Sequence, residues 1–153
     1  MSFIEEIKEM EKERDNKERE IIEDIRKYFK EKMNSKDFEN TLKENYIKSA
    51  LEDGERTFEL RIEFWEYTAG CSNTYIYVGG CGRFELKGIN DNYDSYYNYK
   101  GIRLKDIHKK VCSELSADLK NRLEELGLKI ISSIRTDSNY RFNYYKERIT
   151  IGW

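Results

Sequence analysis

Residues 58–65 read Phe58-Glu59-Leu60-Arg61-Ile62-Glu63-Phe64-Trp65, in which apolar and polar side chains alternate almost strictly. Because successive side chains of a strand point to opposite faces, this alternation predicts a strand with one buried face, as in an antiparallel sheet. Two further strands are predicted at 75–78 and 83–87, joined by the glycine pair Gly79-Gly80 in a tight hairpin. We therefore expect a sheet whose neighbouring strands are connected by short turns.

A long amphipathic helix is predicted after these strands. Apolar residues recur at helical spacing from Leu104 to Leu126, and Gly127 supplies a C-terminal stop. Beyond it, 128–134 and 141–151 are predicted to form a closing hairpin around Asp137-Ser138-Asn139. These patterns together indicate an α+β fold, an antiparallel sheet of about five strands with one amphipathic helix packed across it.

The chain before the sheet is predicted to be helical and densely charged. Residues 3–33 contain neither glycine nor proline, and a wholly polar run at 11–20 separates two apolar stripes. Such a helix would reach about 46 Å at 1.5 Å per residue, so part of it must project or find a partner. Ser35 is the predicted N-cap of a second helix, which ends at Asp53-Gly54.

The predicted order of elements is α-α-β-β-β-α-β-β. It divides the chain into a projecting charged helix (residues 1–34), which would serve assembly or partner docking, and a single α+β domain (residues 35–153). From the projecting helix we expect a homo-oligomer or a complex with a protein partner.

The composition excludes several classes of protein. Of the 153 residues, 38% are hydrophobic and 38% are charged, the formal net charge is −2, and proline is absent. No window approaches about 18 consecutive apolar residues, so we expect no membrane span. Three cysteines, an odd number, argue against a disulfide framework and indicate a cytoplasmic protein with reduced thiols. Abundant Lys, Asn and Ile with scarce Ala favour an AT-rich genome, such as that of a low-GC bacterium or its phages.

The only histidine and the three cysteines are the candidate metal ligands, namely Cys71, Cys81, His108 and Cys112. His108 and Cys112 are i,i+4 neighbours on the predicted helix, and three thiolates with one imidazole would form a tetrahedral zinc site. Nine residues separate Cys71 from Cys81, however, which exceeds the spacing of structural zinc knuckles. We therefore favour core residues over a metal site, and we expect no cofactor and no Cys–His nucleophile.

Other catalytic patterns are weak. Glu59 and Glu63 would lie about 13 Å apart along one strand face, too far for a shared acid/base site, and Arg61 between them indicates a solvated face. The glycines at 79–82 lack the P-loop pattern and are explained by a hairpin turn. No group of residues defines a reaction, so we favour a protein without catalytic activity.

Tyrosine and arginine side chains gather in two segments late in the chain, a polar loop at 88–101 and the last hairpin. The candidate binding residues in them are Tyr93, Tyr96, Tyr97, Tyr99, Arg135, Arg141, Tyr144, Tyr145 and Arg148. Tyrosine offers a large amphipathic contact at low entropic cost, and tyrosine beside arginine can stack a base while the arginine meets a phosphate. For the last hairpin we favour the simpler explanation that tyrosines cover the sheet.

Two functional hypotheses follow from these patterns. The first is a non-catalytic interaction protein, of the kind by which a phage or mobile element binds and blocks a host defence protein. The alternative is a protein that binds a small ligand, a nucleotide or single-stranded nucleic acid through its Tyr/Arg-rich C-terminal part. A sequence pI near 5.7 argues against broad nucleic-acid affinity.

Overall fold

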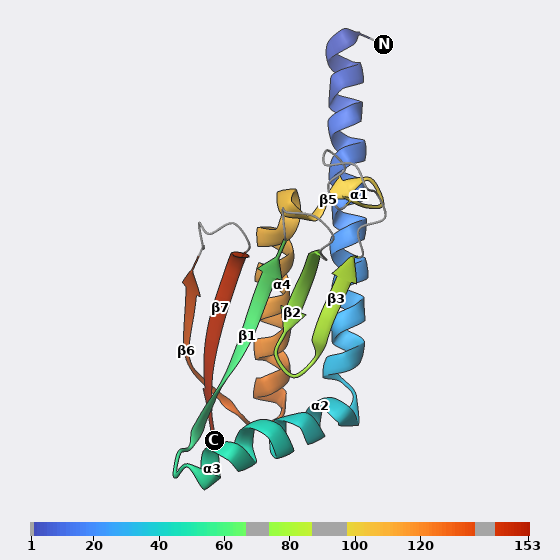
Figure 1. Cartoon of the computed structure of the whole chain (residues 1–153). Helices are drawn as coiled ribbons and strands as arrows, with labels where there is room; N and C mark the ends of the chain where they lie inside the picture. The colour runs from blue at the N-terminus through green and yellow to red at the C-terminus, as the bar shows by residue number, and fades with distance from the viewer. Residues whose placement is uncertain (1, 67–73, 87–97, 137–142) are drawn as a thin grey trace.

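A five-stranded antiparallel sheet forms the centre of the molecule, in the strand order β3-β2-β1-β7-β6 (Figure 1). The computed structural model describes residues 2–66, 74–86, 98–136 and 143–153. The strands of this sheet are β1 (Thr57–Trp65), β2 (Thr74–Val78), β3 (Gly82–Leu86), β6 (Lys129–Thr136) and β7 (Asn143–Gly152). The predicted α+β class is confirmed, with five strands in this sheet.

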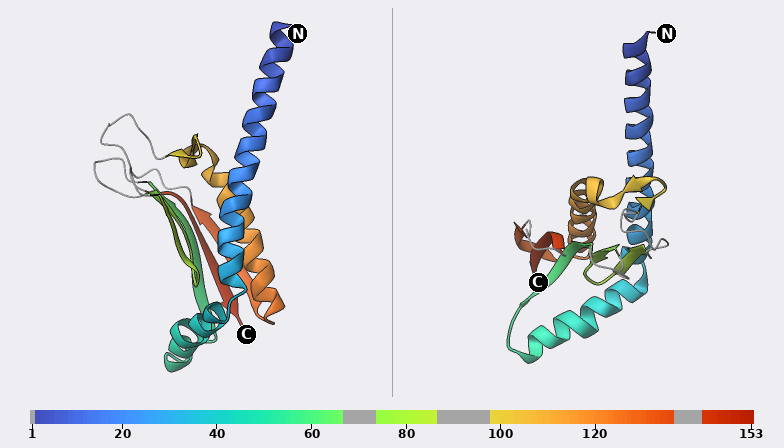
Figure 2. Two further views of the ribbon diagram at one scale, coloured as in Figure 1. Left: turned by 90° about the vertical axis from the view of Figure 1, so that its right-hand side faces the viewer. Right: turned by 45° about the horizontal axis from the view of Figure 1, so that its top comes forward.

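Two long helices cover one face of the sheet, and a shorter helical segment crosses one end of it (Figures 1 and 2). The helices are α1 (Phe3–Met33), α2 (Lys36–Thr41), the π-helical η1 (Leu42–Ile47), α3 (Lys48–Glu52) and α4 (Leu104–Glu125). Seen along the sheet edge in Figure 2, α1 and α4 lie on the same side of the strands. Among the described residues, no helix lies over the other face of the sheet (Figure 2).

One hydrophobic core lies between the sheet and the two long helices. The alternate apolar residues of β1, which are Phe58, Leu60, Ile62 and Phe64, are at most 8% exposed, which confirms the face predicted from their alternation. The apolar stripe of α4 is also buried, as predicted, and the second half of α1 contributes a third set. The buried residues of α1 are Ile21, Ile22, Ile25, Phe29 and Met33. The core therefore requires the C-terminal half of α1, whereas its N-terminal half lies outside.

Several element boundaries lie at the capping and turn residues predicted from the sequence. The side chain of Ser35 accepts a hydrogen bond from the backbone N–H of Phe38 and so caps α2. Gly127, at φ 85°, follows the end of α4 in the left-handed conformation that glycine tolerates best. The hairpin between β2 and β3 turns at Gly79-Gly80, with Gly80 at φ 82°.

Two features differ from the expected elements. The predicted second helix contains the π-helical segment η1, whose wider turn returns Ile47 to the face occupied by Leu42. The predicted loop at 88–101 includes β4 (Asn98–Tyr99), which pairs with β5 (Ile102–Arg103) across Lys100-Gly101. Both turn residues have positive φ, as a type I′ hairpin requires. Residues 87–97 of that loop, and the predicted turn at 137–139, lie outside the described residues.

No helix in the described part of the chain is both long and apolar enough to cross a membrane.

Candidate interaction surfaces

The N-terminal end of α1 extends beyond the rest of the molecule (Figures 1 and 2). Its first turn is closed by a capping box, in which Ser2 and Glu5 exchange side-chain-to-backbone hydrogen bonds at 2.9 and 3.2 Å. Within the described residues, the first ion pair from α1 to another element is that of Arg14 with Asp106, at 4.0 Å. Residues 2–13, at about 1.5 Å per residue, therefore form a helical extension of about 18 Å, which we call the α1 tip.

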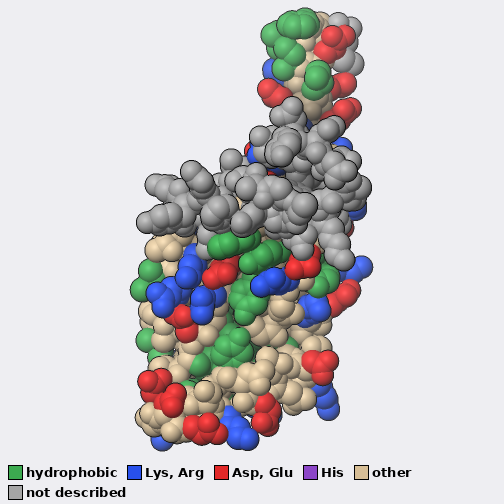
Figure 3. Space-filling model, viewed as in Figure 1, with side chains coloured by type: hydrophobic (Ala, Val, Ile, Leu, Met, Phe, Trp, Pro, Cys, Tyr) green, Lys and Arg blue, Asp and Glu red, His purple; other side chains and the backbone are tan. Residues whose placement is uncertain are grey.

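The α1 tip carries an exposed apolar stripe. The exposed fractions are 75% for Phe3, 59% for Ile4, 36% for Ile7 and 68% for Met10. Figure 3 shows apolar side chains gathered at this end of the molecule, with acidic side chains beside them. Single exposed apolar residues are ordinary, but a contiguous set on a projecting element is typical of an interaction site.

The base of α1 is fixed firmly against α4, so the tip projects in a defined direction. Two hydrogen bonds join Arg26 to Asp118, at 2.9 and 2.8 Å, and this bonding raises the pKa of the arginine. Arg122 Nε donates to the carbonyl oxygen of Met33 at 2.9 Å, so the end of α1 is also bound to α4. Bidentate Arg–carboxylate pairs restrict geometry as well as adding energy.

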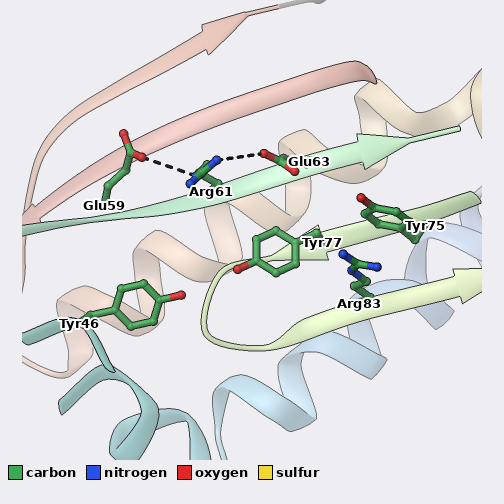
Figure 4. A pocket seen from close by; sticks show the side chains of 7 residues that line it. All are labelled: Tyr46, Glu59, Arg61, Glu63, Tyr75, Tyr77 and Arg83. Atoms are coloured by element: carbon green, nitrogen blue, oxygen red, sulfur yellow. Dashed lines mark ion pairs between the residues drawn. The ribbon is translucent and has the colours of Figure 1, made fainter. Parts of the chain in front are cut away.

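The uncovered face of the sheet is the second candidate surface. The register brings Glu63, Tyr77 and Arg83 into one row across β1, β2 and β3, since Tyr77 is opposite Glu63 on one side and Arg83 on the other. Arg61, two positions from Glu63 on the same face, lies diagonal to Tyr77. A shallow depression of about 330 Å³ lies there (Figure 4). Its lining residues are Tyr46, Glu59, Arg61, Glu63, Tyr75, Tyr77 and Arg83.

The charges of this open face are neutralised locally. Arg61 lies between Glu59 and Glu63, with N–O distances of 3.6 and 3.7 Å, as Figure 4 shows. Arg148 Nε donates to Glu59 at 2.9 Å. These pairs confirm the solvated, alternating face that was expected around Arg61, and they argue against a shared acid/base site there.

Aromatic rings also lie on the open face, beside the arginines. Trp65 and Tyr75 stack with ring centroids 6.3 Å apart, and the guanidinium of Arg83 lies 4.3 Å from the Tyr75 ring centre. Burial, with a hydrogen bond to Tyr46, raises the pKa of Tyr77 to about 12. The Tyr77 hydroxyl is therefore protonated at neutral pH and suited to hydrogen bonding, not to proton abstraction.

Most of the tyrosine loop predicted to bind a partner lies outside the described residues. This applies to Tyr93, Tyr96, Tyr97 and also to Arg141. Tyr99 is placed in β4 and Tyr144 in β7 by their backbones alone.

The other three predicted binding residues do not form one surface. Tyr145 is only 1% exposed, and its hydroxyl donates to Glu147 Oε1 at 2.8 Å on the helix-covered side of the sheet. Arg135 lies over the Tyr145 ring at 4.7 Å. Arg148 is on the opposite, open face, beside Glu59. Alternation along β7 separates Tyr145 from Arg148, because they are an odd number of positions apart.

Glu147 is the centre of a buried polar cluster that the sequence reading missed. Its Oε2 accepts hydrogen bonds from Ser116 at 2.6 Å and Ser133 at 2.7 Å, and Lys120 Nζ lies 3.2 Å away. Burial alone would raise the pKa of Glu147, but these donors and Tyr145 together lower it below its usual value. The carboxylate is thus ionised and fully engaged in joining β6, β7 and α4, which indicates a structural role.

The cysteines and the histidine are placed as core or turn residues wherever they are described. His108 stacks on Phe64 at 4.7 Å and is 7% exposed, while Cys112 is completely buried. Cys81 lies in the β2–β3 turn, where burial raises the pKa of its thiol to about 12. Cys71 lies outside the described residues, and no group of three or more possible metal ligands occurs within them. A thiol with such a pKa is protonated at neutral pH and is a poor nucleophile.

No protein-family model, curated protein or solved structure matches the chain. Functional assignment therefore depends on the geometry and chemistry of the surfaces described above.

Proposed function

We propose that this chain is a non-catalytic interaction protein that binds a partner protein through the α1 tip. The observation that supports this most directly is the exposed stripe of Phe3, Ile4, Ile7 and Met10 on an anchored projecting helix. A folded protein gains nothing for its own core from these side chains. A groove or helix of another protein that covered them would remove their apolar surface from water.

The charges beside the stripe favour a basic partner. Residues 2–13 hold five acidic and two basic side chains. Glu6, Glu11 and Glu13 occupy helical positions next to the stripe, where a docked helix would place its own flanking residues. In a helix pair formed by two copies, glutamates would face one another, Glu6 with Glu11 in a parallel pair and Glu6 with Glu13 in an antiparallel one. An amphipathic partner helix flanked by lysine or arginine meets this surface without that repulsion.

A second candidate function is binding of a nucleotide or single-stranded nucleic acid on the open face of the sheet. The half-buried, stacked rings of Trp65 and Tyr75, together with nearby arginines, favour it. The glutamates paired with Arg61 and Arg148 oppose it, because they already occupy the cations that a phosphate would need. Thermal stabilisation by a single-stranded oligonucleotide, lost on Arg83→Ala, would support this second candidate.

The composition also suggests where the partner should be sought. The bias toward residues with AT-rich codons points to a low-GC bacterium or its mobile elements. An inhibitor that acts by occupying a host defence protein needs a binding surface and no catalytic group. The α1 tip meets this requirement, and extracts of such bacteria are the natural source for partner capture.

The test is a pair of charge-matched variants of the tip. Ile7→Glu/Met10→Glu changes the net charge by −2 within the stripe, while Lys12→Glu makes the same change on the opposite side of the helix. All three positions are exposed, so the free energy of unfolding should change by no more than about 0.5 kcal/mol in either variant. We expect a stoichiometric partner complex with the wild type and with Lys12→Glu, and none with the double variant. Equal recovery of the partner by all three proteins would overturn the proposal.

A further inference from the structure

The exposed stripe of the α1 tip lies on the same side of the helix as residues that meet α4. Eleven residues of an α-helix make about three full turns, so residues eleven positions apart lie almost on one line along its surface. Phe3 and Ile7 precede Arg14 and Glu18 by this spacing, and both Arg14 and Glu18 form ion pairs with α4. The stripe therefore faces the side of α1 on which the beginning of α4 lies.

Further along α1, the same line enters the hydrophobic core. Ile25 and Phe29 lie eleven positions beyond the two ion-pairing residues, and both side chains are completely buried. Phe3, at the other end of this line, is 75% exposed. The face that the rest of the molecule covers in the second half of α1 is thus left open at the tip, where it is again apolar.

The N-terminal end of α4 marks the lower limit of this open side. Asp106, in the first turn of α4, has its carboxylate 4.0 Å from the guanidinium of Arg14. Lys110, one turn later, pairs with Glu18 at 3.3 Å. Beyond this level α1 continues, and no other helix in the described part of the chain lies beside it (Figures 1 and 2). The apolar stripe together with Asp106 is called the tip–α4 surface below.

The charges of the tip–α4 surface favour a basic occupant. Glu6 and Glu11 lie beside the stripe, and neither has an ion-pair partner among the described residues. The side chain of Asp106 is 51% exposed. Arg14, by contrast, is already balanced by Glu18 at 3.6 Å and by Asp106. Lysine or arginine side chains at the edges of an apolar helix would therefore find carboxylates at both ends of this surface.

The distance from the start of α1 to α4 limits the length of the occupant. The α1 tip is about 18 Å long, which corresponds to about 12 residues of α-helix at 1.5 Å per residue. A helix that lay along the stripe would reach the first turn of α4 after that length and would have to end there or turn away. The surface therefore fits a short helix better than a long continuous one.

We propose that the partner of the α1 tip contributes a short, basic amphipathic helix, which lies on the α4 side of the tip and ends against Asp106. This inference rests on the function proposed above and adds where the partner lies, how long its helix is and which second element it contacts. Apolar side chains of that helix would cover Phe3, Ile7 and Met10, and its basic side chains would meet the carboxylates. A second copy of this chain is a poorer occupant, since the exposed apolar helix that it offers is the same acidic tip.

The test uses a peptide of about 12 residues with leucine on one helical face and lysine elsewhere, and a matched peptide with glutamate in place of lysine. Added to the full-length protein, the Leu/Lys peptide should shift the amide NMR signals of the stripe and of Asp106 and Ile107. A nitroxide at one end of this peptide should broaden the signals of Asp106 and Ile107 most strongly, and a nitroxide at the other end those of Phe3 and Ile4. The Leu/Glu peptide should bind at least about tenfold more weakly, because it brings glutamates against glutamates.

Two charge-matched substitutions separate the α4 side of the tip from its outer side. Asp106→Lys and Glu9→Lys each change the net charge by +2 at an exposed position, but Glu9 lies on the side of the helix away from the stripe. We expect Asp106→Lys to weaken binding of the Leu/Lys peptide by about fivefold or more, and Glu9→Lys to weaken it by less than about twofold. Ile7→Glu/Met10→Glu should abolish this binding.

The outcomes distinguish this inference from the function on which it rests. Binding that both lysine substitutions weaken equally, or that leaves the signals of Asp106 and Ile107 unchanged, would overturn the position beside α4 but not binding by the tip. Absence of Leu/Lys binding would overturn a short basic helix as the occupant. In either case, loss of the captured partner in Ile7→Glu/Met10→Glu would still support the proposed function.

Discussion

Replacing Glu147 by alanine is expected to destabilise the fold more than any single change on the open face. Glu147 is 4% exposed and accepts hydrogen bonds from Ser116, Ser133 and Tyr145, with Lys120 as an ion-pair partner. The substitution takes the acceptor away from donors on α4, β6 and β7 at once. It therefore tests whether this one carboxylate holds the edge strand to the helix layer.

The size of the expected loss in unfolding free energy depends on which of these donors can hydrogen-bond to water once Glu147 is removed. Ser116 is 5% exposed and Tyr145 1% exposed, so neither can exchange its lost acceptor freely for solvent. Each buried group that loses its partner costs about 1–3 kcal/mol, which gives about 2–6 kcal/mol for the two. Ser133 is exposed and the Lys120 side chain is 31% exposed, so both can turn to water and add little. A loss of this size is a large fraction of the stability of an ordinary domain.

Urea unfolding of the wild type, Glu147→Ala and the control Glu59→Ala measures the effect. Glu59 also has arginine partners, at 2.9 and 3.6 Å, but its side chain is 35% exposed, so its loss should cost at most about 1 kcal/mol. The midpoint should fall much further for Glu147→Ala than for the control. If Glu147→Ala costs less than about 1 kcal/mol, the cluster does not contribute as described.

The same cluster implies a direction of pH dependence. The hydrogen-bond donors around Glu147 lower its pKa in the folded state, despite the opposing effect of burial. Its contribution to stability is therefore present above the ordinary pKa of a glutamate and is lost as the pH falls through the lowered value. The difference in unfolding free energy between the wild type and Glu147→Gln should narrow over that range. A difference in unfolding free energy that stays constant with pH would contradict the lowered pKa of Glu147.

Three further experiments, two substitutions and one labelling measurement, test other parts of the structure. In urea unfolding, Gly80→Ala should destabilise the fold by about 1–3 kcal/mol more than Gly54→Ala. Both glycines have positive φ, but only at Gly80 would an added Cβ meet a phenylalanine ring of α2, at 2.8 Å. Cys81 should resist alkylation at pH 8 in the native protein and react rapidly in denaturant, because burial raises the pKa of its thiol to about 12. Peptide mass spectrometry would follow the labelling, and rapid labelling of the native protein would contradict the buried placement of Cys81. Arg26→Ala should lower the free energy of unfolding by about 2–3 kcal/mol through loss of the paired hydrogen bonds to Asp118. An unchanged midpoint of urea unfolding would show that these bonds do not stabilise the packing of α1 on α4.

Local sequence signals were sufficient for most of the fold. The alternation in 58–65 identified the central strand and its buried face, and Ser35 and Gly127 marked helix ends through their capping chemistry. These signals act within a few residues, so they can be read without knowing the rest of the structure. The polar, Asn/Asp/Tyr-rich composition of 88–101 predicts a loop there, and the hairpin at Lys100-Gly101 was not predicted. Lysine is an unusual residue at a turn position with positive φ, so this turn has little local sequence signal.

The candidate surfaces were harder to predict because they depend on contacts between distant segments. Tyr77 and Arg83 become neighbours of Arg61 only through the pairing of β1, β2 and β3. Glu147 lies on the same strand face as the buried Ile149, two positions away, so its burial could be predicted from alternation. Of its four partners, however, only Tyr145 is on the same strand, and the others come from elements up to 31 positions away. Register across a sheet depends on turn geometry and on packing along the whole face, which a single segment does not encode.

Partner binding by the α1 tip is tested most directly by measuring the mass of the complex. The wild type, Ile7→Glu/Met10→Glu and Lys12→Glu would each be mixed with the purified captured partner and analysed by native mass spectrometry. We expect a complex of defined stoichiometry with the wild type and with Lys12→Glu, and free chains only with the double variant. A complex of unchanged stoichiometry and stability with the double variant would show that the partner binds elsewhere and would contradict the proposed function.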